Sequence, residues 1–396
     1  MSNNPQFSRR TNWPLTSNKL SLDLERLRSN KVSILDLTES NPTRCKFFYL
    51  QNNFLSSLSG EKNLQYSPAS RGQLKARETI CRYYAEKGSA VLPEQIFLTA
   101  STSEAYSYLF RLLVNPGEQV LFPSPSYPLF SFLGDLNDVC IDTYRLVYKN
   151  KWGVDLEGIE AIICEDTKAL VMVNPNNPTG TFIHQEELER INALSQKHHF
   201  ALISDEVFSD FAFNQDKNHL SLVGNDQVLT FVLGGISKTL GLPQMKLSWI
   251  IVSGPKSLVE DAAARLEIIS DTYLSVNTPV QNALPAWLRQ RKVIQKEING
   301  RIFQNFQFLK EQINAAPECT LLEGEGGWYA VLSIPDSYSE EKWILAFLNK
   351  DHVAVHPGYF FDFETEAHIV ISLLPPPSTF QDGIKRILDR IKTGNL

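Results

Sequence analysis

The apolar and polar positions of the chain alternate between short β-type runs and longer stretches with helical spacing. Apolar runs that predict strands span residues 96–100, 119–122, 140–146, 169–173, 201–204, 228–233 and 247–252. Helical spacing near residues 104–114, 186–197 and 256–267 lies between them, long enough to cross over between parallel strands. This alternation predicts an α/β fold with a seven-stranded, mostly parallel sheet wrapped by helices.

A second, smaller α+β unit is expected after Pro279. A long helical region, residues 280–314, leads into strand-like runs at 326–332, 353–356 and 369–373 and into helices near 340–349 and 380–392. The polar N-terminal arm, with a helix near residues 20–28, is expected to pack against this unit. We therefore expect an arm and part of the small domain in residues 1–48, a large domain in 49–290 and a C-terminal small domain in 291–396.

Composition narrows the function classes. The 396 residues carry a net charge of -6 without a basic stripe, which argues against a nucleic-acid or anionic-membrane surface. Five scattered cysteines, odd in number and without CxxC spacing, predict neither a disulfide framework nor a metal site. No apolar run follows Arg9 and Arg10, so we expect neither a signal peptide nor a membrane span, and a cytoplasmic protein.

Candidate chemistry begins at the stretch from Gly234 to Lys246. Lys238 follows the apolar run 228–233 and two glycines, which predicts a turn at the carboxyl end of a buried strand, where open α/β sheets place their ligands. Burial disfavours an ammonium group, and an uncharged amine can form a Schiff base with an aldehyde such as pyridoxal phosphate. A Ser-Lys pair on a glycine turn is more often a solvated loop, so other residues must support this interpretation.

Two further strand ends carry residue types that such a cofactor needs. The run 169–173 leads into a turn with two Asn-Pro pairs, whose amides can donate to a phenolic oxygen. The run 201–204 leads into Asp205, and a buried carboxylate needs a cationic or donor partner such as a pyridinium N–H. Their ordinary alternatives are a simple turn and a locally paired acid.

Two other strand ends complete the set. Ser101, Thr102 and Ser103 open a helix after the run 96–100, and helix N-termini with hydroxyls bind phosphate. Tyr127 follows the run 119–122 and offers a flat face for an aromatic ring. A helix N-cap and a core tyrosine are the ordinary alternatives, but the joint occurrence of all these features in this order favours a cofactor site.

The sequence resembles the class I/II aminotransferases of pyridoxal phosphate fold type I. The resemblance rests on Asn177-Pro178-Thr179-Gly180, Asp205-Glu206-Val207-Phe208 and Gly235-Ile236-Ser237-Lys238 followed by Lys246, and it extends from about Asp36 to Leu373. Position by position, it implies Lys238 as the Schiff-base lysine and proton shuttle, Asp205 on the pyridine nitrogen and Asn177 on the phenolic oxygen. It also implies Tyr127 against the ring, Ser101, Thr102 and Ser103 with Gly235, Ser237 and Lys246 around the phosphate, and Tyr66 reaching the phosphate of a neighbouring subunit.

Several positions depart from the family pattern. Phe208 stands where a tyrosine usually donates to the phenolic oxygen, so we expect the Schiff-base nitrogen to keep its proton to higher pH. Lys246 replaces an arginine on the phosphate, which keeps the charge but loses the bidentate fork. Gly235 lacks the hydroxyl often found at its position.

The departure at Val370 concerns the substrate. Val370 stands where the family has an arginine that clamps the α-carboxylate of the amino donor. Either another cation replaces it, with Arg44 and Arg71 as candidates on turns at the edge of the site, or the donor is not an ordinary α-amino acid. Solvated surface is the ordinary alternative for both arginines.

The resemblance implies an aminotransferase that moves an amino group from an amino acid or amine to a 2-oxo acid. A pyridoxal phosphate-dependent β- or γ-lyase is the alternative on the same fold, since the cofactor performs the hard step in both. A sensor that holds the cofactor without turnover is disfavoured, because the chain before Asp36 is too short for a DNA-binding domain. The resemblance also implies a homodimer with shared sites, to which Tyr273 and Asn277 would contribute.

Overall fold

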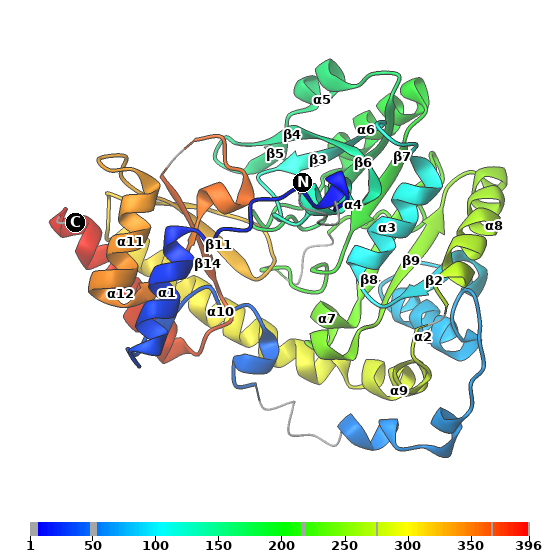
Figure 1. Cartoon of the computed structure of the whole chain (residues 1–396), viewed down its shortest axis with the longest axis horizontal. Coiled ribbons are helices and arrows are strands. Elements are labelled where there is room, and N and C mark those ends of the chain that lie inside the picture. The colour runs from blue at the N-terminus through cyan, green and yellow to red at the C-terminus, as the bar shows by residue number, and fades with distance from the viewer. Residues whose placement is uncertain (1–6, 48–53, 215–218, 275, 366, 395–396) are drawn as a thin grey trace, which may run out of the picture.

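The chain folds into a larger and a smaller part that are joined along the helix α10 (Arg291–Asn314) (Figure 1). The computed structural model describes residues 7–47, 54–214, 219–274, 276–365 and 367–394, so the expected boundary at residues 48 and 49 lies outside the described residues. The long helical region expected after Pro279 is divided. It forms α9 (Thr278–Arg289) and α10, which meet at Gln290.

The larger part is built on an eight-stranded sheet in the order β2-β9-β8-β7-β6-β3-β4-β5. Its strands are β2 (Ile96–Thr99), β3 (Gln119–Ser124), β4 (Cys140–Tyr148), β5 (Trp152–Val154), β6 (Thr167–Val173), β7 (Ala201–Asp205), β8 (Thr230–Gly235) and β9 (Ser248–Ser253). Strands β4, β3, β6, β7 and β8 run parallel, whereas β9 and β5 are antiparallel to their neighbours. The predicted α/β class with a mostly parallel sheet is confirmed. The predicted number of seven strands is wrong, because β5 has only three residues and shows no period.

Helices cover both faces of this sheet, which explains why its strands read as continuous apolar runs. Successive residues of β7 show the two faces: Ala201 and Ile203 pack with α3 (Thr102–Leu113), α4 (Phe130–Asn137) and α8 (Lys256–Thr272). Leu202 packs in the core that includes α2 (Leu74–Ala85), α5 (Leu156–Ile162) and α6 (Gln185–His198). None of the helices in the described residues combines the length and the apolar character that a membrane crossing requires.

The smaller part combines the C-terminal residues with the start of the chain. Its four-stranded sheet has the order β10 (Thr320–Leu322), β11 (Tyr329–Ser333), β14 (His368–Ser372) and β13 (His356–Pro357). A separate pair joins β1 (Leu35–Asp36) to β12 (Val353–Ala354) in parallel, and α1 (Lys19–Ser29) packs against α11 (Glu340–Asp351). With α12 (Pro377–Thr393), these elements form the left half of Figure 1. The N-terminal segment thus packs against the C-terminal unit.

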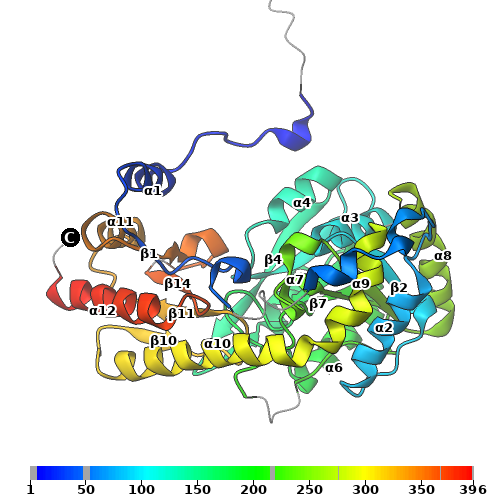
Figure 2. The same ribbon diagram turned by 90° about the horizontal axis from the view of Figure 1, so that it is seen from below.

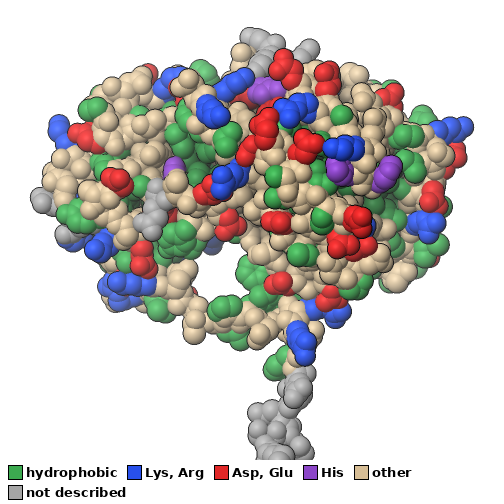
Figure 3. Space-filling view, turned by 90° about the horizontal axis from the view of Figure 1, so that it is seen from above, with side chains coloured by type: hydrophobic (Ala, Val, Ile, Leu, Met, Phe, Trp, Pro, Cys, Tyr) green, Lys and Arg blue, Asp and Glu red, His purple; other side chains and the backbone are tan. Residues whose placement is uncertain are grey.

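The segment ahead of α1 crosses back to the larger part, where Arg10 and Trp13 contact α4 and the residue that follows it. Arg10 forms an ion pair with Asp138, and the Trp13 indole N–H donates to Asp135 over 2.6 Å. The Trp13 ring also meets the edge of Phe132 at a centroid distance of 5.1 Å. Figure 2 shows this strap running from α1 toward α4, and Figure 3 shows that it arches over an opening in the surface.

The two parts also meet where the backbone around Gly180 lies against that around Gly324. The Gly180 carbonyl accepts hydrogen bonds from the amides of Glu325 and Gly326, at 2.9 and 3.0 Å. A Cβ atom on Gly324 would lie 2.2 Å from the Thr179 carbonyl oxygen. The absence of a side chain therefore lets the Asn-Pro turn of the larger part dock on the loop that leads into β11.

We expect Gly324→Ala to lower the free energy of unfolding by about 1–3 kcal/mol, because the added methyl must push two backbone segments apart. Gly300→Ala is the matched control: Gly300 lies within α10, and an added Cβ would meet no atom within 4 Å. The control should be neutral or stabilising by up to about 1 kcal/mol, since alanine favours helix. Urea denaturation of both variants checks this, and equal stabilities would contradict the close approach at Gly324.

Candidate active site

The carboxyl ends of β7 and β8 bring an acid and a lysine together. The parallel pairing of these strands sets Asp205 opposite Leu233, and α7 (Ile236–Thr239), which carries Lys238, begins where β8 ends. Burial lowers the pKa of Lys238 to about 8, and the negative charge of Asp205 opposes that shift. Burial raises the pKa of Asp205 to about 6. Hydrogen bonds from the Val207 amide and the Tyr106 hydroxyl, and the positive charge of Lys238, lower that pKa and so offset part of the rise. An amine that is partly uncharged near neutral pH is suited to attack a carbonyl carbon.

Two glycines let the backbone ahead of Lys238 press against β9. A Cβ atom on Gly235 would lie 2.4 Å from the Ser248 hydroxyl oxygen, and one on Gly234 would lie 2.5 Å from the indole nitrogen of Trp249. The missing hydroxyl at Gly235 thus has a structural reason, because the hydroxyl of Ser248 already occupies that space.

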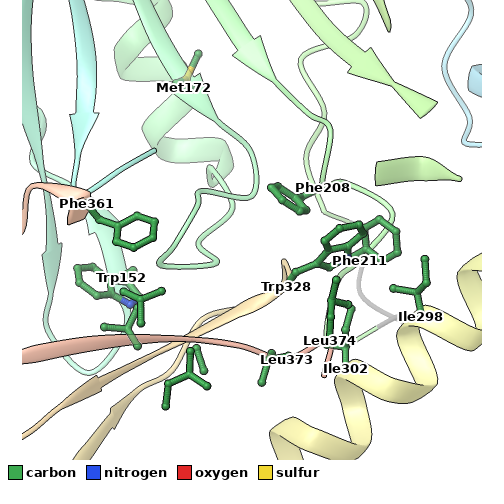
Figure 4. Close-up of a cluster of buried hydrophobic side chains, with 14 of the residues drawn as sticks. Trp152, Met172, Phe208, Phe211, Ile298, Ile302, Trp328, Phe361, Leu373 and Leu374 are labelled. Carbon is green, nitrogen blue, oxygen red and sulfur yellow. The ribbon is translucent and has the colours of Figure 1, made fainter. Parts of the chain in front are cut away.

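Aromatic rings enclose the amine of Lys238. Its Nζ lies 5.1 Å from the ring centroid of Phe208 and 4.8 Å from that of Trp328. The two rings meet edge to face at 5.3 Å, and Figure 4 shows them pointing toward each other from the larger and the smaller part. Sequence reasoning missed Trp328. Its signal was an aromatic residue directly after the glycine pair 326–327 at the start of a predicted strand. Among the described residues its buried indole N–H has no hydrogen-bond partner.

The Asn-Pro turn separates a structural asparagine from an available one. The Asn176 amide donates to the Pro125 carbonyl at 3.0 Å and accepts from the Ser126 hydroxyl at 3.2 Å, which ties the turn to the end of β3. Asn177 is also buried, yet its Oδ1 has no partner within the described part of the chain. A buried amide oxygen without a partner is costly unless a ligand satisfies it. Asn177 is therefore the member of the pair whose side chain is left available for a ligand.

The start of α3 and the end of β3 supply the remaining predicted cofactor contacts. Ser101 caps α3, with its hydroxyl oxygen accepting from the Glu104 amide at 3.1 Å, and Thr102 and Ser103 form the first turn. The amides of that turn point out of the helix end, an arrangement that favours an anion. Tyr127 is 42% exposed, so part of its side chain is open to a ligand.

The other predicted residues lie farther out or are engaged elsewhere. Lys246 is exposed with a positive φ of 52°, Ser237 is half-buried, and the Tyr66 side chain is 72% exposed. Arg71 donates to Glu267 at 2.9 Å through Nε and stacks over Phe97.

Neither remaining substrate candidate offers a ready anchor for a carboxylate. The Arg44 side chain is 73% exposed and lies 3.5 Å from the Glu39 carboxylate. Val370 lies wholly buried in β14, paired with Val331 and His356.

The chemistry of this set fits pyridoxal phosphate. A half-buried lysine of lowered pKa suits its aldehyde, and a buried carboxylate suits its ring nitrogen. The buried Asn177 amide suits its phenolic oxygen, because the amide N–H groups can donate to that oxygen. A helix N-terminus suits its phosphate.

Comparison with known proteins gives the same family throughout. Residues 37–387 match the family described as aminotransferase class I and II. Glutamate-pyruvate aminotransferase AlaA of Escherichia coli (strain K12) is 26% identical over 360 residues, covering 89% of each chain. Alanine aminotransferase of Mycobacterium bovis is 27% identical over 327 residues, 80% of this chain and 76% of that one.

Solved structures agree on the fold. Alanine aminotransferase from Pyrococcus furiosus superposes with a TM-score of 0.88 at 23% identity, covering 98% of this chain and all of the other. An aminotransferase from Escherichia coli superposes with a TM-score of 0.86 at 25% identity, covering 98% of each. The chain therefore belongs to the class I and II aminotransferases, a family of enzymes that depend on pyridoxal phosphate and share fold type I.

Proposed function

We propose that this chain binds pyridoxal phosphate at Lys238 and moves an amino group from an amino donor to a 2-oxo acid. The observation that carries this proposal is the half-buried Lys238, whose pKa is lowered to about 8 by burial, beside the buried Asp205 at the ends of adjacent strands. Relatives named for alanine and for glutamate and pyruvate support a small amino acid and a 2-oxo acid as the substrate pair.

The chain's own residues would divide the work. When bound, pyridoxal phosphate supplies the aldehyde that takes the donor's amine and the ring that withdraws electrons from it. Lys238 Nζ then takes a proton from the donor's α-carbon and returns it one carbon away, which requires an uncharged amine. Phe208 and Trp328 exclude water around Nζ. Asp205 accepts the ring N–H, and the first turn of α3 binds the phosphate.

Recognition of the donor's carboxylate would differ from the family pattern. Val370 has no charge to offer, and using Arg71 would break its pair with Glu267. Trp328 offers a neutral donor beside Lys238. Neutral donors bind a carboxylate less strongly than a guanidinium fork does, so we propose either weak carboxylate recognition or a donor amine without an α-carboxylate.

A homodimer is part of the proposal. Apolar side chains are exposed on two adjoining segments, with Leu64 and Tyr66 on one and Ile268 and Leu274 at the end of α8 on the other. The hydrogen bond from Ser70 to Glu267 joins these segments. Tyr66 would then face a partner's site. Asn277 is occupied as the cap of α9, which leaves Tyr273 as the freer of the two other predicted contributors.

Single-turnover absorbance with the cofactor-loaded protein tests the function. We expect a panel of donors, including alanine, glutamate and amines without a carboxylate, to convert the bound cofactor to its amine form. Lys238→Ala should abolish conversion. If carboxylate-free amines alone react, Val370 marks a change of substrate class. If no donor converts the cofactor, or if a leaving group is released instead, transamination is contradicted in favour of a sensor or a lyase.

Phe208→Tyr restores the hydroxyl that the family usually has. We expect it to lower the pH at which the bound cofactor's absorption band titrates by about one unit, because a hydrogen bond to the phenolic oxygen favours loss of the nearby proton. Phe213→Tyr, on a ring that packs against Phe306 instead, should leave the titration unchanged. An unusually acidic transition in the unmodified protein would refute the expectation.

The charges of the half-buried Lys238 and the buried Asp205 should destabilise the cofactor-free protein. Lys238 costs stability below its folded pKa of about 8, and this cost is lost as the pH rises toward 10.5. Asp205 costs stability above about pH 6, and this cost is lost as the pH falls toward 3.8. Both costs coincide between about pH 6 and 8. The double variant Asp205→Asn, Lys238→Met should therefore be more stable there by about 1–4 kcal/mol.

Denaturant unfolding of the apoproteins at pH 5, 7 and 9 measures this gap, which should be widest at pH 7. A double variant that is less stable than the parent at pH 7 would show that the pair stabilises the fold.

A further inference from the structure

Tyr106 places a hydroxyl on the carboxylate of Asp205 from a neighbouring helix. Its oxygen lies 3.2 Å from Asp205 Oδ2, while Oδ1 accepts from the Val207 amide, also at 3.2 Å. We propose that Tyr106 is a positioning residue of the cofactor site, holding Asp205 ionised and oriented toward the ring nitrogen. This inference rests on the proposed function, because it assumes that Asp205 meets pyridoxal phosphate.

The surroundings leave the Tyr106 ring little freedom. The side chain is 2% exposed, and its ring meets those of Phe110, Phe122 and Phe130 at centroid distances of 6.0, 6.2 and 5.3 Å. These contacts hold the hydroxyl in one place and keep water from replacing it. Burial, followed by the charge of Asp205, raises the pKa of Tyr106 well above its ordinary value. The phenol therefore keeps its proton, and can donate, to higher pH than an ordinary tyrosine.

The hydroxyl acts on the charge of Asp205. Burial favours the neutral acid, and the groups that oppose it are the Val207 amide, the Tyr106 hydroxyl and Lys238. Removing the hydroxyl leaves the backbone amide as the one remaining hydrogen-bond donor to the carboxylate among the described residues. Asp205 would then hold its proton to higher pH, and a protonated acid is a weaker partner for a pyridinium N–H.

The position of Tyr106 on α3 links both ends of the cofactor to one rigid element. The first turn of the same helix carries Thr102 and Ser103, the predicted phosphate contacts. A single helix would therefore help to hold the phosphate and, through Asp205, the ring nitrogen. This arrangement depends on a tyrosine that no motif of the chain includes.

Tyr106→Phe tests the inference, with Tyr144→Phe as the matched control. Tyr144 is buried as deeply and donates one hydrogen bond of 2.8 Å, but to the Val171 carbonyl. The readouts are the affinity of each apoprotein for pyridoxal phosphate by equilibrium dialysis across pH 5–9, and apoprotein melting temperature as a folding check. We expect Tyr106→Phe to weaken affinity about tenfold at pH 6 and to move its acidic decline up by about one pH unit. The control should do neither.

A double-mutant cycle that combines Tyr106→Phe with Asp205→Asn tests whether Tyr106 acts by positioning Asp205 or by stabilising the fold in general. If Tyr106 acts through the carboxylate, Tyr106→Phe should have little further effect on affinity in the Asp205→Asn background. Equal effects in both backgrounds, or equal effects of Tyr106→Phe and Tyr144→Phe, would overturn the inference while leaving the proposed function intact. If the unmodified protein binds no pyridoxal phosphate, the proposed function itself fails.

Discussion

The site depends on holding two opposite charges, the half-buried Lys238 and the buried Asp205, largely away from water at the ends of neighbouring strands. Burial opposes the charged form of each group, and their mutual attraction offsets only part of that cost. The parallel register of β7 and β8 holds the two side chains near each other, and helices on both faces of the sheet keep solvent away. The resulting lowered lysine pKa is a property of the assembled sheet.

Hydrogen bonds within the site leave some groups bound and others available. Asn176 is used to fasten the turn to β3, whereas the Asn177 Oδ1 atom has no partner in the part of the chain that the structure describes. Among the described residues, Asp205 accepts from two donors, and the Trp328 indole N–H finds no acceptor. A site that is only partly satisfied by its own chain is prepared for a ligand, since filling it recovers hydrogen bonds that the empty fold lacks.

The contact between the larger and the smaller part determines which side chains lie next to Lys238. Close approach at Gly180 and Gly324 brings the loop before β11 against the Asn-Pro turn, and that loop delivers Trp328 to Lys238. The position of the expected carboxylate-binding arginine is filled by Val370 inside a sheet. Aromatic rings rather than a guanidinium therefore surround the reactive amine, a difference that bears on which donors the enzyme accepts.

The fold class, the strands of the main sheet apart from β5, and the candidate lysine, acid and asparagine could all be predicted from the amino-acid sequence. Apolar runs followed by chemically active residues are local signals, because a buried parallel strand and the turn that ends it are contiguous in the chain. Only tertiary contacts show that Trp328 lies beside Lys238, that Tyr106 donates to Asp205 and that Arg71 is tied to Glu267. Tyr106 and Asp205 are 99 positions apart in the sequence, and Arg71 and Glu267 are 196 positions apart. No local period encodes such pairings, since they arise only when packing brings the elements together.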